Sequence, residues 1–111
     1  MKATIYHNPR CSKSRAALTL LTDAGVDVAV IEYLKTPPTR TELAELLHRA
    51  QLTPRQALRT GEPEAKPLKN ATDDAILDAM ADHPILIERP IVETANGVVI
   101  ARPPERVHYI L

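Results

Sequence analysis

The stretch that decides the fold is ATIYHNPRCSKSRAALTLLTDAGVDVAVIEYL, residues 3–34. Residues 3–6 and 26–34 are apolar and rich in β-branched side chains, which indicates two strands. Between them, segment 12–24 carries apolar residues at helical spacing, and Gly25 follows at a position where helices commonly end. Strand, helix and strand within this length form a βαβ unit, so we expect parallel strands joined by a right-handed crossover.

The middle of the chain favours helices. Residues 39–42, Thr-Arg-Thr-Glu, have the spacing of a capping box and precede apolar residues at helical spacing. A short helix is expected over 54–59, and Thr72 is expected to cap a further helix that ends near His83. Segment 60–71 holds Gly and Pro among polar residues, so we interpret it as a loop.

The last third of the chain predicts a β-hairpin and a helix. Strands are expected over 91–94 and 98–101, around the type I′ turn signal Asn-Gly at 96–97. Residues 103–105, Pro-Pro-Glu, are suited to start a final helix. The chain is therefore expected to form one α/β domain over 1–111, with a four-stranded mixed sheet, flanking helices and a helical insertion in the middle. This arrangement is typical of the thioredoxin/glutaredoxin-like fold.

Composition and charge exclude several classes of protein. Fourteen basic residues balance 14 acidic ones, so no global positive field would draw the chain to nucleic acid or to an anionic membrane. The chain starts without the apolar stretch of a signal peptide, and no run approaches the roughly 18 apolar residues of a membrane helix, so we expect a cytoplasmic protein. The single cysteine cannot supply a Cys-based zinc site by itself, so we expect no metal. It cannot form an internal disulfide either, so any redox cycle requires a thiol from another molecule.

That cysteine, Cys11, lies between the end of the first expected strand and the start of the first expected helix. Unpaired backbone N–H groups and the positive end of a helix dipole lower the pKa of a thiol at such a place. His7 and Arg10 precede it, and Lys13 and Arg15 occupy the first helical turn, where positive charge opposes the dipole. Several positive residues at a helix start go against the usual local preference, and such departures often mark a functional site. A reactive thiolate is therefore favoured over a cysteine that acts as a small buried hydrophobe.

Three blocks of this sequence resemble the glutaredoxin-coupled arsenate reductases. In the order that the family has them, they are IYHNPRCSKSR at 5–15, PILIERPIV at 84–92 and ARPPE at 101–105. They cover both ends of the domain, so the similarity spans nearly the whole chain. Residues 12–13 are Ser-Lys where the plasmid-type enzymes have Gly-Thr, and the chain ends at Leu111 without their longer tail, so it is closer to a chromosomal subgroup.

The resemblance implies a role for each matched residue. The implied site consists of Cys11 and His7 as catalytic residues, Arg59, Arg89 and Arg102 as ligands of the oxyanion, Pro90 as a cis-proline opposite the cysteine, and Asn8, Ser14 and Arg15 as supporting residues. Cys11 would be the nucleophile, and His7 would help to hold it as a thiolate. A tetrahedral dianion suits planar guanidinium groups that are always charged. His7 could instead cap the loop, and Ser14 could be an ordinary first-turn residue.

The implied activity is the reduction of arsenate, or of a similar oxyanion, with glutathione as co-substrate, glutaredoxin as partner and no bound cofactor. Two alternatives stay open. An Spx-like transcriptional regulator that binds RNA polymerase shares the fold, although typical members carry Cys-x-x-Cys where residues 11–14 read Cys-Ser-Lys-Ser. A general glutathione-dependent thiol transferase would need Cys11 but not the full set of arginines.

Overall fold

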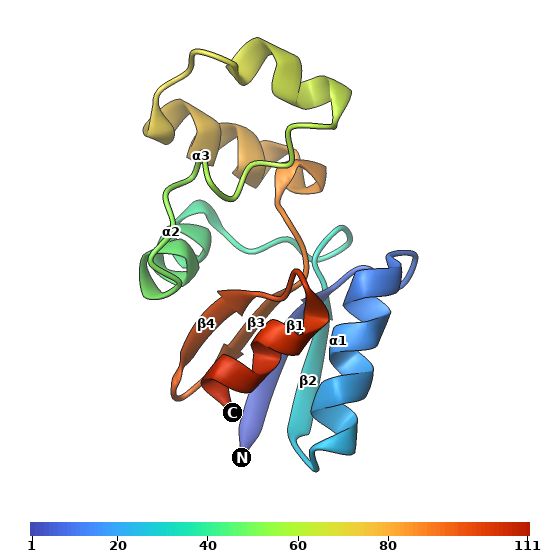
Figure 1. The fold of residues 1–111 in the computed structure, drawn as a ribbon. Coiled ribbons are helices and arrows are strands. Elements are labelled where there is room, and N and C mark those ends of the chain that lie inside the picture. Colours follow the sequence, from blue (N-terminus) through green and yellow to red (C-terminus); the bar gives the residue numbers. More distant parts are fainter. The chain divides into compact units, whose positions relative to one another are not determined.

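The computed structural model describes residues 1–111, and its backbone contacts divide the chain into two compact units. The first unit contains Met1–Thr36 and Arg89–Leu111, and the second contains Pro37–Glu88 (green to orange in Figure 1). The second unit is thus inserted into the sequence of the first, which confirms the expected insertion in the middle of the chain. The expectation of a single domain over 1–111 stays a prediction.

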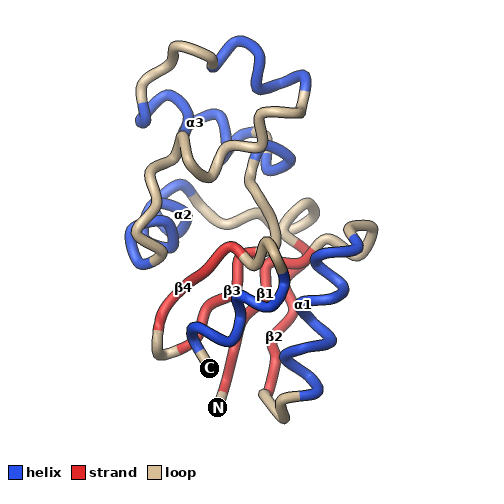
Figure 2. The backbone as a smooth tube through the Cα atoms, in the orientation of Figure 1, coloured by secondary structure: helices blue, strands red, loops and turns tan.

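The first unit is built on a four-stranded mixed sheet (red in Figure 2). Its strands are β1 (Lys2–His7), β2 (Asp27–Glu32), β3 (Ile91–Thr94) and β4 (Gly97–Ile100), in the order β2-β1-β3-β4. β1 is parallel to β2 and antiparallel to β3, and β3 is antiparallel to β4. The mixed sheet and its parallel pair, both expected from the sequence, are confirmed.

Two helices of the first unit pack on the sheet and share one aliphatic core. They are α1 (Ser12–Asp23) and a 3-10 helix, η3 (Pro104–Ile110). The fully or nearly fully buried residues of this core are Ala3 and Ile5 of β1, Ala17 and Leu21 of α1, Val92 of β3, Ala101, and Val107 and Ile110 of η3. The alternation along β1 and the helical spacing along α1 put these side chains on one face of each element. Gly25, with φ +76°, follows the end of α1 as expected.

The β3–β4 hairpin is confirmed, but its predicted type I′ turn is wrong. Thr94 pairs with Gly97, so the two turn residues are Ala95 and Asn96, and neither has a positive φ. The Thr94 side chain stabilises this turn instead, because its hydroxyl accepts from the Asn96 N–H (3.1 Å) and donates to the Ile110 carbonyl (2.6 Å). Asn-Gly therefore lies one position too late to form the central pair of a type I′ turn.

The second unit is helical. It contains α2 (Arg40–Arg49), η1 (Pro63–Leu68, a 3-10 helix), α3 (Asp73–Asp82) and η2 (Pro84–Leu86, 3-10). The expected capping box is present at α2, where the Thr39 hydroxyl accepts from the Glu42 N–H and the Glu42 carboxylate accepts from the Thr39 N–H. Thr72 caps α3 through the Ala75 N–H. Across both units, no helix combines the length and apolar character that crossing a membrane requires.

Two expectations for the second unit are wrong. Residues 54–59 form no helix, because after one turn Leu58 pairs with Ile87 in an isolated antiparallel bridge. The bridge is closed by the Arg59 N–H to the Leu86 carbonyl and by the Glu88 N–H to the Ala57 carbonyl, both 2.8 Å. The predicted loop 60–71 contains η1, whose start at a proline suits the fixed φ of that residue.

We expect Gly97→Ala to lower the free energy of unfolding by about 1–2 kcal/mol. Gly97 has φ +156°, and an added Cβ would lie 3.3 Å from Cγ2 of Ile110. Gly61→Ala is the matched control, because a Cβ there has no atom within 4 Å. Urea unfolding followed by circular dichroism compares the two variants with the unmodified protein, and equal midpoints for all three would contradict the prediction.

Candidate active site

The candidate site begins at the loop between β1 and α1. Cys11 is the N-cap residue of α1, with φ −93° and ψ 122°, and its side chain is partly exposed. Its N–H donates to the Asn8 carbonyl (3.0 Å), and its own carbonyl accepts the Arg15 N–H (3.0 Å) at the start of the helix. Because the first N–H groups of a helix lack partners within the helix, the sulfur lies beside free donors.

The register of the sheet brings two predicted arginines to the same end of the first unit. Tyr6 pairs with Ile91, so the loop after β1 and the residues before β3 share one end of the sheet. The Ala101 N–H donates to the Pro90 carbonyl (2.9 Å), so the hairpin opens at that end too. Arg89 directly precedes Pro90, and Arg102 directly follows Ala101. Both arginines therefore lie at this end of the sheet.

Two cis peptide bonds lie beside these arginines. The Arg89-Pro90 bond is cis, which confirms the prediction for Pro90. The Arg102-Pro103 bond is also cis, and the sequence analysis did not predict it.

The pKa of the Cys11 thiol lies below its ordinary value. Partial burial raises that pKa, but hydrogen bonds from the backbone N–H groups of Ser14 and Lys13 lower it, and so do the charge and the hydrogen bond of Arg89. Arg89 also has a buried Nε without a hydrogen-bond partner. The sequence predicted a low pKa from the N–H groups of the helix start and from the cationic side chains near Cys11. The structure confirms the role of the first-turn N–H groups, but the cation that lowers the pKa is Arg89, which is distant in the sequence.

His7 and Ser14 form a buried pair behind the loop. Nδ1 of His7 lies 2.6 Å from Oγ of Ser14, and that oxygen also accepts the Asn8 N–H (3.0 Å). The side chains of His7 and Ser14 are 7% and 0% exposed. Burial lowers the pKa of His7, Glu32 raises it and Arg15 lowers it, with a net decrease. The lowered pKa favours the neutral imidazole, and its direct contact is with Ser14.

The other supporting residues fix the loop through its backbone. The Arg15 guanidinium donates from Nη1 to the Pro9 carbonyl (2.9 Å). The Asn8 side-chain oxygen accepts the Arg10 N–H (3.0 Å). Asn8, Ser14 and Arg15 thus all hydrogen bond within the segment that presents Cys11.

Arg59 lies in the second unit, where its partner is an acid that the sequence analysis missed. Its Nη1 lies 3.0 Å from Oε1 of Glu62, and the two side chains are 26% and 19% exposed. The available sequence signal was an acid three residues after an arginine, a spacing at which side chains meet within a turn. Cys11, Arg89 and Arg102 belong to the first unit, and Arg59 with Glu62 belongs to the second.

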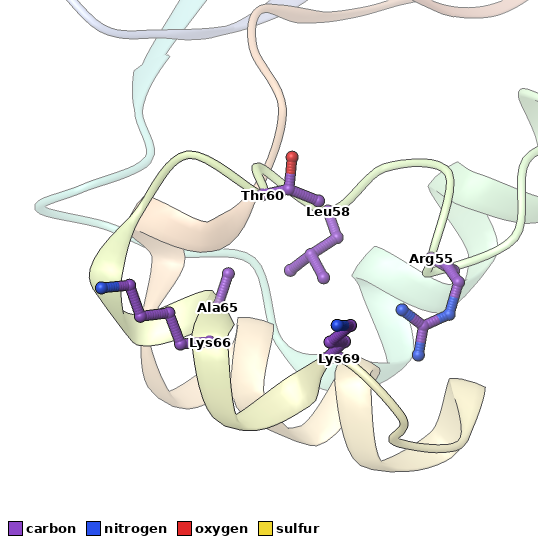
Figure 3. A pocket seen from close by; sticks show the side chains of 6 residues that line it. All are labelled: Arg55, Leu58, Thr60, Ala65, Lys66 and Lys69. Atoms are coloured by element: carbon purple, nitrogen blue, oxygen red, sulfur yellow. The ribbon is translucent and has the colours of Figure 1, made fainter.

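The second unit also holds a cavity of about 330 Å³. Figure 3 shows its lining residues, which are Arg55, Leu58, Thr60, Ala65, Lys66 and Lys69. The Arg55 guanidinium hydrogen bonds to the backbone, where it donates to the carbonyls of Leu68 (3.1 Å) and Ala71 (2.7 Å). No group of three or more His, Cys, Asp or Glu side chains in the structure is placed to hold a metal ion.

Comparison with known proteins points to one family. Residues 6–110 match the ArsC family. The arsenate reductase of Rhizobium meliloti (strain 1021) is 46% identical over 115 residues, which cover 100% of this chain and 82% of that protein. An arsenate reductase of Neisseria meningitidis serogroup B is 43% identical over 112 residues, which cover 96% of each chain. The solved arsenate reductase of Vibrio cholerae superposes with a TM-score of 0.94 at 45% identity, covering 100% of this chain and 98% of its own.

We expect Arg89→Leu to raise the pKa of the Cys11 thiol, because the substitution removes both a positive charge and a hydrogen bond at the sulfur. Arg10→Leu is the matched control, since this exposed arginine does not contribute to the lowered pKa. The rate of alkylation by iodoacetamide against pH gives the midpoint for each variant. A midpoint of the unmodified protein at or above that of an ordinary thiol, or equal shifts in the two variants, would contradict the assignment.

Proposed function

The chain belongs to the ArsC family, and from this premise we propose that it reduces arsenate to arsenite through a covalent adduct on Cys11. The proposal rests on one observation: the Cys11 thiol, at the start of α1, has a lowered pKa and forms a hydrogen bond with Arg89. A thiolate with an arginine beside it combines a nucleophile with an anion ligand. The near-full-length similarity to arsenate reductases supports the same conclusion.

The first step is attack on arsenic. Arg89 and Arg102 of the first unit bind the dianionic oxyanion through charge-assisted hydrogen bonds. The Cys11 thiolate attacks the arsenic atom and forms an S–As bond, and one arsenate oxygen takes up protons and leaves as water. The backbone N–H groups of Lys13 and Ser14, which hydrogen bond to the Cys11 sulfur, stabilise its negative charge before the attack.

Reduction needs a second thiol, because Cys11 is the only cysteine in the chain. Glutathione attacks the Cys11 sulfur, a disulfide forms, and the electron pair of the breaking S–As bond stays on arsenic. Arsenic(V) thereby becomes arsenic(III), and the two sulfurs are oxidised to a disulfide. A glutaredoxin thiolate then attacks the glutathione sulfur and releases Cys11 by thiol–disulfide exchange. This cycle uses glutathione as co-substrate and requires no bound cofactor or metal, and it suits the cytoplasm, where such thiols are kept reduced.

The proposal predicts that arsenate accelerates the attachment of glutathione to Cys11. Incubation with arsenate and glutathione should give an adduct visible by intact mass, and glutaredoxin should discharge it. Phosphate at equal concentration is the control, because it has nearly the same shape and charge but is not reduced by thiols. Equal rates of glutathione attachment with the two anions would contradict the reductase assignment and favour a thiol transferase or a redox-responsive regulator.

Arg89→Leu and Arg102→Leu should each lower kcat/KM for arsenate by about tenfold to a hundredfold, as expected for the loss of a hydrogen bond to a charged group. Arg106→Leu is the matched control, because this exposed arginine lies over the Tyr109 ring, 5.5 Å from its centroid, and has no assigned role at the site. Circular dichroism checks that each variant keeps its fold. Near-normal arsenate kinetics in both site variants would place the oxyanion elsewhere.

A further inference from the structure

The cavity of about 330 Å³ in the second unit has an apolar interior with a fixed backbone. Leu58 and Ala65, which line it, are only 5% and 6% exposed. The backbone of Leu58 is held by its bridge to Ile87, and the Ala65 N–H donates to the Glu62 carbonyl (3.0 Å). The volume lies at the lower end of the range for small-molecule pockets, and such pockets are largely preformed and mostly apolar.

The charged side chains that line this cavity are all cationic. They belong to Arg55, Lys66 and Lys69, and no acidic residue lines it. Figure 3 shows the apolar side chains of Leu58 and Ala65 between Lys66 on one side and Arg55 on the other. Neither lysine forms an ion pair with an acid of the chain. The cavity therefore combines an apolar interior with positive charge that the protein itself does not compensate.

Arg55 adds a fixed guanidinium to the cavity. Its Nη2 donates to the carbonyls of Leu68 and Ala71, which hold the side chain in place. Its Nε and Nη1 have no partner within the chain. Carbonyl groups carry no net charge, so the guanidinium keeps its full positive charge and has donors left for a ligand.

We infer that this cavity binds a small organic anion, a carboxylate carried on an apolar body. An inorganic anion would pair with the cations but would leave the apolar interior uncovered, whereas a neutral apolar molecule would leave the cations uncompensated. All lining residues belong to the second unit and Cys11 belongs to the first, so the cavity is separate from the site at Cys11. The inference does not depend on the proposed function.

Three small probes distinguish the two halves of this inference. Benzoate has a carboxylate and an apolar ring, benzamide has nearly the same shape without the charge, and acetate has the charge without the ring. Titration of the isotope-labelled protein, followed by its amide NMR signals, gives the dissociation constant and the place of binding. Benzoate should shift the signals of the cavity residues and bind at least about threefold more tightly than benzamide or acetate.

Substitutions at the cavity test the same contacts from the side of the protein. Lys66→Gln and Lys69→Gln should each raise the dissociation constant of benzoate about two- to fivefold, the range for one exposed charge pair. Lys2→Gln is the matched control, because it removes the same charge from an exposed position of the first unit and should change nothing. Ala65→Leu should fill the cavity and abolish binding, with circular dichroism as the check of its fold.

Each outcome of these measurements decides the inference. Equal binding of benzoate and benzamide would show that the cations do not recognise charge, and equal binding of benzoate and acetate would show that the apolar interior contributes nothing. Either result would overturn the inference, as would NMR shifts located away from the cavity or unchanged benzoate affinity in both lysine variants. These two lysines are exposed, so their variants keep the test valid even if Ala65→Leu fails to fold.

Discussion

The hydrogen bonds between the Cys11 sulfur and the backbone N–H groups of Ser14 and Lys13 are the interaction on which the rest of this site depends. They exist because β1 ends at His7 and α1 starts at Ser12, which leaves Cys11 as the N-cap residue beside unpaired donors. Partial burial acts against the thiolate, so the sulfur needs these donors and the charge of Arg89 to ionise. The lowered pKa of Cys11 is therefore a property of a strand–helix junction held in place by a sheet.

A buried polar network keeps that junction in shape. Ser14 occupies the first turn of α1 with no exposed surface, and its hydroxyl joins His7 at the end of β1 to the Asn8 backbone. Burying a hydroxyl and an imidazole is costly unless each finds a partner, and here they find one another. The lowered pKa of His7 favours the neutral imidazole, which suits a hydrogen bond to the Ser14 hydroxyl.

Local sequence patterns were sufficient where local interactions decide the structure. The capping box at Thr39, the cap at Thr72 and the glycine after α1 each depend on residues a few positions apart, and each was predicted correctly. The segment 54–59 was predicted wrongly, because its backbone groups pair with residues near Ile87 that lie far away in the sequence. The hairpin was predicted at its correct place, but the Thr94 side chain and the approach of Gly97 to Ile110 selected a different turn.

The sequence by itself determined the βαβ unit, the hairpin, the position of Cys11 at a helix start, the cis bond at Pro90 through the family resemblance, and the lack of a second thiol. Only the tertiary structure decided that Arg89 lowers the pKa of Cys11, because this arginine lies far from Cys11 in the sequence and meets the sulfur through the pairing of β1 with β3. Only the tertiary structure placed Glu62 on Arg59, through a turn anchored to Leu86. The physical reason is the same in both cases: a motif fixes the type of a residue and its neighbours along the chain, whereas charges and hydrogen bonds act over distances in space that are set by non-local backbone pairing.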